Sequence, residues 1–309
     1  MMRLGIDLGG TNTVVGLCTT DGKLIDKLSA PTPTGDSAAL CSTMRDLCRT
    51  LCEKHGLSTD EIERIGIGLP GAIVKSTCTL KFGTNLGMSN VCFAHVFEPD
   101  FSCTVAIDND ANCAALGEFV GGAGKGTQNM LMVTLGTGVG GGIVLNGKLY
   151  TGREDLAGEI GHMVLVPNGA PCNCGRNGCF ETYTSATGLI RLAREAMEQD
   201  QTSVLHDWTR ETKLNAKMVC DACDAGDALA QRVFSEYCDY LACGLTNLVN
   251  VFQPDSIVIG GGVAGYGEKL FAPLRERVHA EQFHVASEGT PIVGAMLGND
   301  AGIIGAALL

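Results

Sequence analysis

One pattern occurs twice in the chain: a hydrophobic strand, a glycine-rich turn and a returning strand. In the first copy, residues 4–8 lead into Gly9-Gly10 and return through 13–17; in the second, 130–135 lead into Gly136-Thr137-Gly138 and return through 142–145. Repetition of a whole strand–turn–strand unit indicates internal duplication of one α/β unit. Two such units facing each other are expected to form a cleft lined by two phosphate-accepting turns.

The other elements follow from hydrophobic spacing and turn residues. We expect a third strand at 23–30, a helix through 40–51, strands at 65–69 and 105–108, a helix from 111, helices between 184 and 252, and a strand at 256–260. A chain of 309 residues is long enough for two domains, each with its own core. The expected small lobe is 1–118 with a C-terminal helix at about 297–309, and the expected large lobe is 119–296.

Composition limits the classes of binding partner and the cellular compartment that we expect. The net charge of −12 repels phosphate backbones, so no nucleic-acid partner is expected. The fifteen cysteines are an odd number in a chain with ample core, which argues against a disulfide scaffold and for a reducing cytoplasm. We expect no N-terminal leader and find no apolar run long enough to span a membrane, so no membrane partner is expected.

A cluster of metal-ligand residue types lies between 158 and 181. It has the spacing His-x9-Cys-x-Cys-x4-Cys, with Glu159 and Glu181 close to its two ends. One imidazole and three thiols suit tetrahedral zinc and leave no open position for water, so the predicted ion is structural. A chance grouping in a cysteine-rich chain is the alternative. The predicted zinc ligands are His162, Cys172, Cys174 and Cys179.

The glycine-rich turns are candidate phosphate-binding segments, because glycine lets backbone N–H groups approach an anion closely. A tight hairpin is the alternative for the first turn, and a strand-to-helix turn is the alternative for 260–262, where an adenine or ribose ring would lie. Asp7 is placed to hold Mg²⁺. Neither turn has the Gly-Lys-Ser/Thr ending of a P-loop. The predicted ATP and magnesium residues are Asp7, Gly9, Gly10, Thr11, Asn12, Gly136, Thr137, Gly138, Gly260, Gly261 and Gly262.

Polar residues also gather at the carboxyl end of the strand at 105–108, in the run Asp108-Asn109-Asp110-Ala111-Asn112. In open α/β sheets this edge faces the ligand crevice. Two interpretations of Asp110 stay open at this point. It is either the N-cap of the following helix or a general base that receives a proton from a hydroxyl group.

With these motifs in place, the chain resembles the ROK family of sugar kinases, and within it is most similar to the bacterial glucokinases. The resemblance runs nearly end to end. It comprises the Asp-Leu-Gly-Gly-Thr-Asn turn at 7–12, Gly-Leu-Pro-Gly at 68–71, Asn-Leu-Gly at 85–87, Asn-Asp-Ala-Asn at 109–112, Glu-x-Gly-His at 159–162, the cysteine run at 172–181, and Gly-Asn-Asp-Ala-Gly at 298–302. It implies a two-lobed α/β fold of the actin-like ATPase (ribonuclease H-like) type with duplicated βββαβαβα units.

The resemblance also implies roles for particular residues. Asp110 corresponds to the catalytic base, and the cluster described above corresponds to the zinc ligands. The implied substrate-binding residues are Gly71, Asn85, Asn109, Asp110, Glu159, His162 and Glu181. One ring nitrogen of His162 would bind the metal while the other reaches a sugar hydroxyl, so the zinc would brace the sugar-binding loop.

The implied activity is ATP-dependent phosphorylation of a hexose at its C6 hydroxyl, as in glycolysis. Glucose is the first expectation, and N-acetylmannosamine, mannose and fructose are alternatives, because Met88 stands where glucokinases of the family often have tryptophan. Closure of the lobes and a homodimer or homotetramer are expected. A sugar-responsive regulator of the family is another alternative; it would carry a helix-turn-helix before the first turn, and none is expected here. A non-kinase ATPase would not need the group formed by Glu159, His162 and Glu181.

Overall fold

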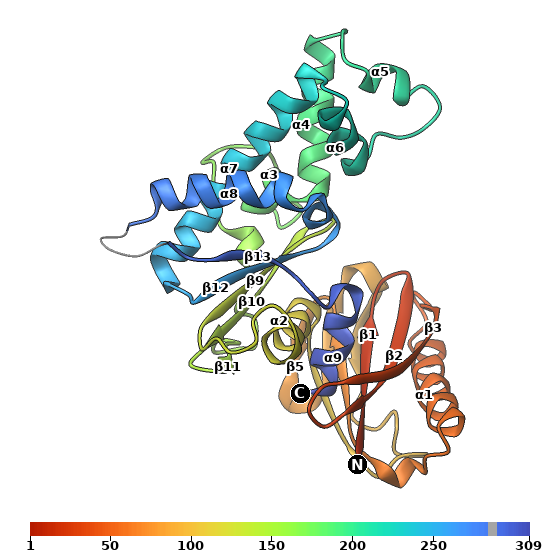
Figure 1. The fold of residues 1–309 in the computed structure, drawn as a ribbon. Coiled ribbons are helices and arrows are strands. Elements are labelled where there is room, and N and C mark those ends of the chain that lie inside the picture. Colours follow the sequence, from red (N-terminus) through yellow and green to blue (C-terminus); the bar gives the residue numbers. More distant parts are fainter. Residues whose placement is uncertain (284–288) are drawn as a thin grey trace. The chain divides into compact units, whose positions relative to one another are not determined.

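The computed structural model describes residues 1–283 and 289–309, so His284, to which the sequence assigns no role, lies outside the described residues. The fold mixes helices and strands (Figure 1). The strands are β1 Met2–Leu8, β2 Asn12–Thr19, β3 Leu24–Pro31, β4 Ile62–Leu69, β5 Ala72–Val74, β6 Thr79–Gly83, β7 Met88–Cys92, β8 Thr104–Asn109, β9 Met130–Leu135, β10 Val139–Leu145, β11 Lys148–Leu149, β12 Ser256–Gly260 and β13 Ile292–Gly294.

The α-helices are concentrated in the second half of the chain. They are α1 Ser37–Lys54, α2 Asp110–Gly121, α3 Phe180–Thr184, α4 Ala186–Gln199, α5 Leu205–Trp208, α6 Ala216–Asp224, α7 Ala228–Phe252, α8 Glu268–Glu281 and α9 Ala301–Ala307. Local signals set several boundaries. Helix α1 begins after Asp36, whose side chain accepts from the Ala39 N–H. A capping box of Ser58 and Glu61 begins a short 3₁₀ helix at Thr59–Glu61.

The two main sheets have the same strand order, which is the structural signature of the predicted duplication. The first is ordered β3-β2-β1-β4-β8 and the second β11-β10-β9-β12-β13. In the first sheet, β1 pairs antiparallel with β2, while β1, β4 and β8 are parallel. A third sheet, β5-β6-β7, is an insertion in the first half that the sequence patterns did not predict.

The described chain divides into two compact units. The first is Met1–Met132, Gly142–Gly158 and Met296–Leu309, and the second is Val133–Gly141 with Glu159–Ala295. The segments 119–132 and 142–158 therefore group with the first unit, and the expected domain boundary after residue 118 stays a prediction.

Helix α9 packs on the first sheet with its backbone almost touching the strands (Figure 1). A Cβ atom at Gly66 of β4 would overlap the carbonyl oxygen of Ala306, and one at Gly305 would overlap the carbonyl oxygen of Cys113 in α2. Such contacts leave no room for a side chain, so glycine at these positions allows the C-terminal helix to seat against β4 and α2. Ile6 of β1 and Ile67 of β4 are fully buried and belong to the hydrophobic core that also contains Leu40 and Met44 of α1.

In the second unit, α7 packs against α3, α4, α6 and α8. Tyr237 of α7 is fully buried and donates a 2.6 Å hydrogen bond to the carbonyl oxygen of Thr184, at the end of α3. Helix α7 thus holds α3, which directly follows the last predicted metal ligand, in place. Among the described residues, no helix is both long and apolar enough to cross a membrane.

Candidate active site and metal-binding residues

Three parallel strands of the first unit end at one edge of the sheet and present the predicted polar residues there. Asp7 near the end of β1 is in register with Gly68 of β4, and Leu69 is in register with Asn109, the last residue of β8. Gly71 follows β4 at a φ of 111°, and a Cβ there would overlap the carbonyl oxygen of Phe82. The structure therefore brings the Asp7, Gly71 and Asn109 segments to the same edge.

The first glycine turn is a closed hairpin whose outer residues face solvent. The Gly9 N–H donates to the Asn12 carbonyl at 3.0 Å, and the Thr32 hydroxyl donates to the Gly9 carbonyl at 2.7 Å. Gly10 lies against Asn85, whose Cβ would be 3.4 Å from a Cβ at Gly10. Gly10, Thr11 and Asn12 are exposed. The segment is a hairpin turn between β1 and β2 whose tip is open to a ligand, and phosphate binding by it stays a prediction.

Asp110 is the first residue of α2 rather than its cap. The cap is Asn109, whose side-chain oxygen accepts from the N–H groups of Ala111 at 2.9 Å and Asn112 at 3.3 Å. Burial raises the pKa of Asp110, and hydrogen bonds from the Ala111 N–H and the Asn109 side chain offset part of that rise. The capping function is thus filled by a neighbour, and Asp110 is a carboxylate with increased basicity.

Asp7 is the second carboxylate at this edge. Burial, and then the charge of Asp110, raise its pKa from 3.8 to about 6. Its carboxylate also closes the space beside α9, because a Cβ at Gly302 would lie 3.2 Å from it. Asp7 and Asp110 repel each other when both are ionised. A bound cation or uptake of a proton would relieve this repulsion.

The junction between β8 and α2 is held by an ion pair between a buried aspartate and a partly buried lysine, which the sequence did not reveal. Asp108 is 1% exposed; it accepts from the Asn109 N–H at 2.7 Å and from the Asn112 side chain at 2.9 Å, and it pairs with Lys75. Lys75 also lies 3.9 Å from Asp155. Lys75 precedes Asp108 by 33 positions, so no local pattern in the sequence relates them.

The four predicted metal ligands are brought together in the second unit. Their ligand atoms all lie within 4.8 Å of one another, with Cys174 Sγ 3.6 Å from Cys179 Sγ and Cys172 Sγ 3.7 Å from Nδ1 of His162. Tetrahedral zinc, with bonds of about 2.3 Å to sulfur and 2.0–2.1 Å to nitrogen, would hold such atoms about 3.5–3.8 Å apart. The three cysteines are free thiols rather than disulfide partners. The donor set and the spacing therefore fit zinc.

The ring of His162 has two distinct sides. Nδ1 faces Cys172, whereas Nε2 lies 3.9 Å from a carboxylate oxygen of Glu159. The Glu159 side chain is 62% exposed and the His162 side chain 36% exposed. Nδ1 is thus the nitrogen placed beside the other metal-ligand atoms, and contact of Nε2 with a sugar hydroxyl stays a prediction.

Glu181 contacts the second glycine turn. Its Oε2 accepts from the Val139 N–H at 2.9 Å, and a Cβ at Gly138 would overlap the same oxygen. The turn is closed by a 3.0 Å hydrogen bond from the Gly136 N–H to the Gly138 carbonyl. The expected contact of Glu181 with a sugar stays a prediction, and the link to the turn is one that the sequence did not reveal.

The third glycine segment follows β12. Gly260 is the last residue of that strand, and Gly261 packs against the backbone of Leu135, directly before the second turn. A Cβ at Gly262 would have no atom within 4 Å. The structure thus places two predicted nucleotide segments of this unit side by side, with open space above Gly262.

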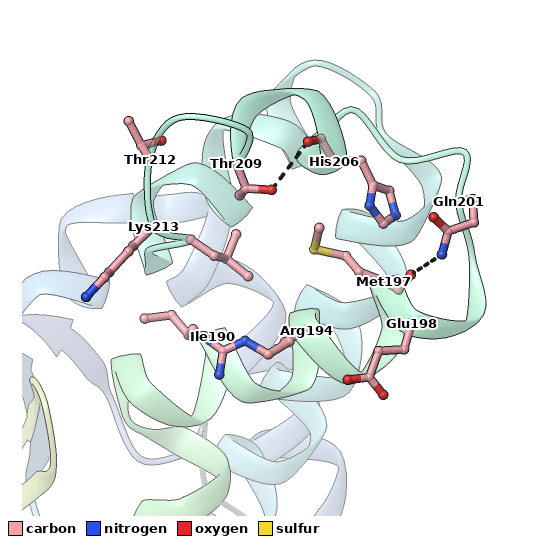
Figure 2. Close-up of a pocket in the computed structure, with 10 residues that line it drawn as sticks. Ile190, Arg194, Met197, Glu198, Gln201, His206, Thr209, Thr212 and Lys213 are labelled. Carbon is pink, nitrogen blue, oxygen red and sulfur yellow. Dashed lines mark hydrogen bonds between the residues drawn. The ribbon is translucent and has the colours of Figure 1, made fainter.

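A cavity of about 680 Å³ lies elsewhere in the second unit, where side chains of α4 face the segment from 201 to 214 (Figure 2). Its lining residues are Ile190, Arg194, Met197, Glu198, Gln201, His206, Thr209, Thr212, Lys213 and Leu214, which include none of the predicted site residues.

Comparisons with known proteins agree with this arrangement. The ROK family model matches residues 3–309. A glucokinase of Halalkalibacterium halodurans is 42% identical over 98% of this chain and 92% of its own length, and one of Thermotoga maritima is 36% identical over 98% and 95%.

A solved ROK-family glucokinase of Streptomyces griseus, in complex with glucose and AMPPNP, matches with a TM-score of 0.82. It is 30% identical and covers 99% of this chain and 98% of its own. The likeness, together with the matching strand orders of the two sheets, confirms the predicted actin-like fold class. The chain belongs to the ROK family of proteins.

Proposed function

We propose that this chain is an ATP-dependent hexose kinase that transfers the γ-phosphoryl group of ATP to the C6 hydroxyl of glucose. The observation that carries the proposal is its likeness, over nearly the whole chain, to glucokinases, one of them solved with glucose and an ATP analogue. The placement of Asp110 at the sheet edge that also carries the first glycine turn supports the same chemistry.

In this proposal Asp110 is the general base. Its raised pKa makes it a better proton acceptor than an exposed aspartate, while the N–H of Ala111 and the side chain of Asn109 hold the carboxylate in place. As Asp110 accepts the proton of the sugar hydroxyl, the oxygen attacks the γ-phosphorus and ADP leaves. A positioned base contributes about 10²–10⁴ in rate.

The remaining roles are proposed from the two glycine turns and the polar residues near them. The turns at 9–12 and 136–138 would bind phosphate through backbone N–H groups other than those of Gly9 and Gly136, which close the turns. Residues 260–262 would lie along the adenosine, and Asn85, beside Gly10, would bind the sugar. Asp7 would hold Mg²⁺, which when bound neutralises charge on the phosphates. All of these groups act by position and charge rather than by covalent chemistry.

The sugar is proposed to contact Gly71, Asn109, Glu159, His162 and Glu181. Zinc would be held by His162 and the three cysteines and, with four protein ligands, would have no open position for catalysis. Its contribution would be to keep the loop ordered and to fix the orientation of the His162 ring, so that the second ring nitrogen is held in place for a ligand.

The test is a coupled ADP-release assay with ATP and a panel of glucose, mannose, fructose, N-acetylmannosamine and N-acetylglucosamine. Glucose is expected to have the highest kcat/KM, with glucose 6-phosphate identified as the product by glucose-6-phosphate dehydrogenase. Sugar-independent ATP hydrolysis with no sugar phosphate would contradict a kinase. A higher kcat/KM for an N-acetylhexosamine would contradict glucose as the substrate but keep the class.

Two further expectations accompany the proposal. A reducing cytoplasm is supported by the fifteen cysteines, all of which lie in the described residues as free thiols. A homodimer or homotetramer stays a prediction, and light scattering of the purified protein tests it.

A further inference from the structure

Glu181 is bonded to the second glycine turn from within the metal loop. One carboxylate oxygen accepts from the Val139 N–H at 2.9 Å, and the other lies 3.9 Å from Sγ of the metal ligand Cys172. Val139 is the first residue of β10, immediately after the turn. A single side chain therefore spans the distance from the metal centre to the turn.

The backbone that follows Glu181 holds the same turn at two more points. The Ala186 N–H donates to the Gly136 carbonyl at 2.8 Å, and the Thr187 hydroxyl donates to the Thr137 carbonyl at 2.9 Å. This segment begins at Cys179, the last metal ligand, and α3 starts at the next residue. The metal loop and the supports of the turn are thus one continuous piece of chain.

The contact is specific in its chemistry. A backbone N–H bonded to a carboxylate is a charge-assisted hydrogen bond, about twice as strong as a neutral one. The absence of a side chain at Gly138 is what lets the carboxylate reach Val139, because a Cβ there would overlap Oε2. Once it is engaged in this way, Oε2 has a partner in the protein before any sugar binds.

We propose that Glu181 is a positioning residue through which the Cys₃His metal centre holds the second glycine turn in its nucleotide-binding conformation. The inference rests on the proposed function, in which this turn binds the phosphates of ATP. It has a consequence that a sugar-binding role alone lacks: metal and Glu181 set the affinity for nucleotide in the absence of any sugar.

The experiment measures binding of AMPPNP with Mg²⁺ to the zinc-loaded protein by isothermal titration calorimetry, without sugar. Glu181→Ala is expected to weaken binding about 10–100-fold, the range for losing a hydrogen bond to a charged group. Glu181→Gln, whose amide oxygen can still accept from Val139, is expected to stay within about fivefold of the wild type. Glu181→Asp is too short to reach and should resemble Glu181→Ala; it replaces that variant if alanine prevents folding.

Glu211→Ala is the control. Its carboxylate is exposed in the same unit and belongs to none of the predicted sites, so AMPPNP affinity is expected to stay within about twofold of the wild type. The metal-free Cys174→Ser protein should lose nucleotide affinity, and adding Glu181→Ala to it should cause little further loss, because both changes break the same link.

The inference is overturned if folded Glu181→Ala or Glu181→Asp protein binds AMPPNP within about twofold of the wild type. It is also overturned if Glu181→Gln is as weak as Glu181→Ala, or if the metal-free protein keeps full nucleotide affinity. Failure of the proposed function appears differently, as a wild-type protein that binds AMPPNP but forms no sugar phosphate.

Discussion

Replacing Asp7 with asparagine should stabilise the fold by an amount that depends on pH. The folded protein raises the pKa of Asp7 from 3.8 to about 6, so ionising this carboxylate is unfavourable in the native state. A shift of about two units corresponds to about 3 kcal/mol at 1.36 kcal/mol per unit, which is an upper value for a half-buried group. Asparagine fills a similar volume and cannot ionise.

The sign follows from proton linkage. Below pH 3.8 the carboxyl is protonated in both states and costs nothing. Between 3.8 and about 6 the unfolded chain ionises while the folded protein keeps its proton, so wild-type stability falls as the pH rises through this window and is level above it. The gain from Asp7→Asn should therefore be about 3 kcal/mol at pH 7.5 and about 1.5 kcal/mol at pH 5.0.

Urea unfolding followed by circular dichroism at both pH values measures the difference in the free energy of unfolding. Tryptophan fluorescence is unsuitable, because the single tryptophan, Trp208, lies in the second unit and Asp7 in the first. The exposed Asp60→Asn is the control and should change the stability little. Because burial is the larger cause, Asp110→Asn should recover only part of the gain. An Asp7→Asn effect that is equal at the two pH values, or larger at pH 5.0, would refute the reasoning.

Three further changes test the packing, the ion pair and the metal site. Gly66→Ala should destabilise by about 1–3 kcal/mol in thermal unfolding, because the new methyl group overlaps the Ala306 carbonyl; an unchanged Tm would contradict this packing. Lys75→Met leaves Asp108 buried and unpaired and should cost about 3–5 kcal/mol, partly restored by Asp108→Asn; no restoration would count against the ion pair. Cys174→Ser should reduce bound zinc, measured by mass spectrometry of the purified protein, well below one equivalent; full occupancy would rule this thiol out as a ligand.

The features that the sequence predicted are local ones. The strands that flank each glycine turn are short hydrophobic runs, and the glycines mark where the chain reverses. These local features predicted the duplication, and the matching strand orders of the two sheets confirm it. The metal ligands were predictable because their spacing lies within one loop. The insertion sheet β5-β6-β7 was missed, because its strands are three to five residues long and carry no clear alternation.

The supports of the candidate site could not be predicted, because they join residues far apart in the chain. Lys75 reaches Asp108 across 33 positions, and Glu181 reaches Val139 across 42. Composition and spacing carry no information on such pairs. From the sequence, Asp110 could be either a helix cap or a base. The structure identifies Asn109 as the cap. Two adjacent polar residues can each cap a helix, and only the backbone geometry decides between them.

Turnover of the Asp110→Asn protein with glucose and ATP tests the central claim most directly. Asparagine keeps the size of the side chain but cannot accept the proton, so kcat should fall about 10²–10⁴-fold. Glucose affinity measured by calorimetry and zinc content should stay close to the wild type. A variant that keeps near-normal kcat would contradict the assignment of Asp110 as the base, and with it the proposed mechanism.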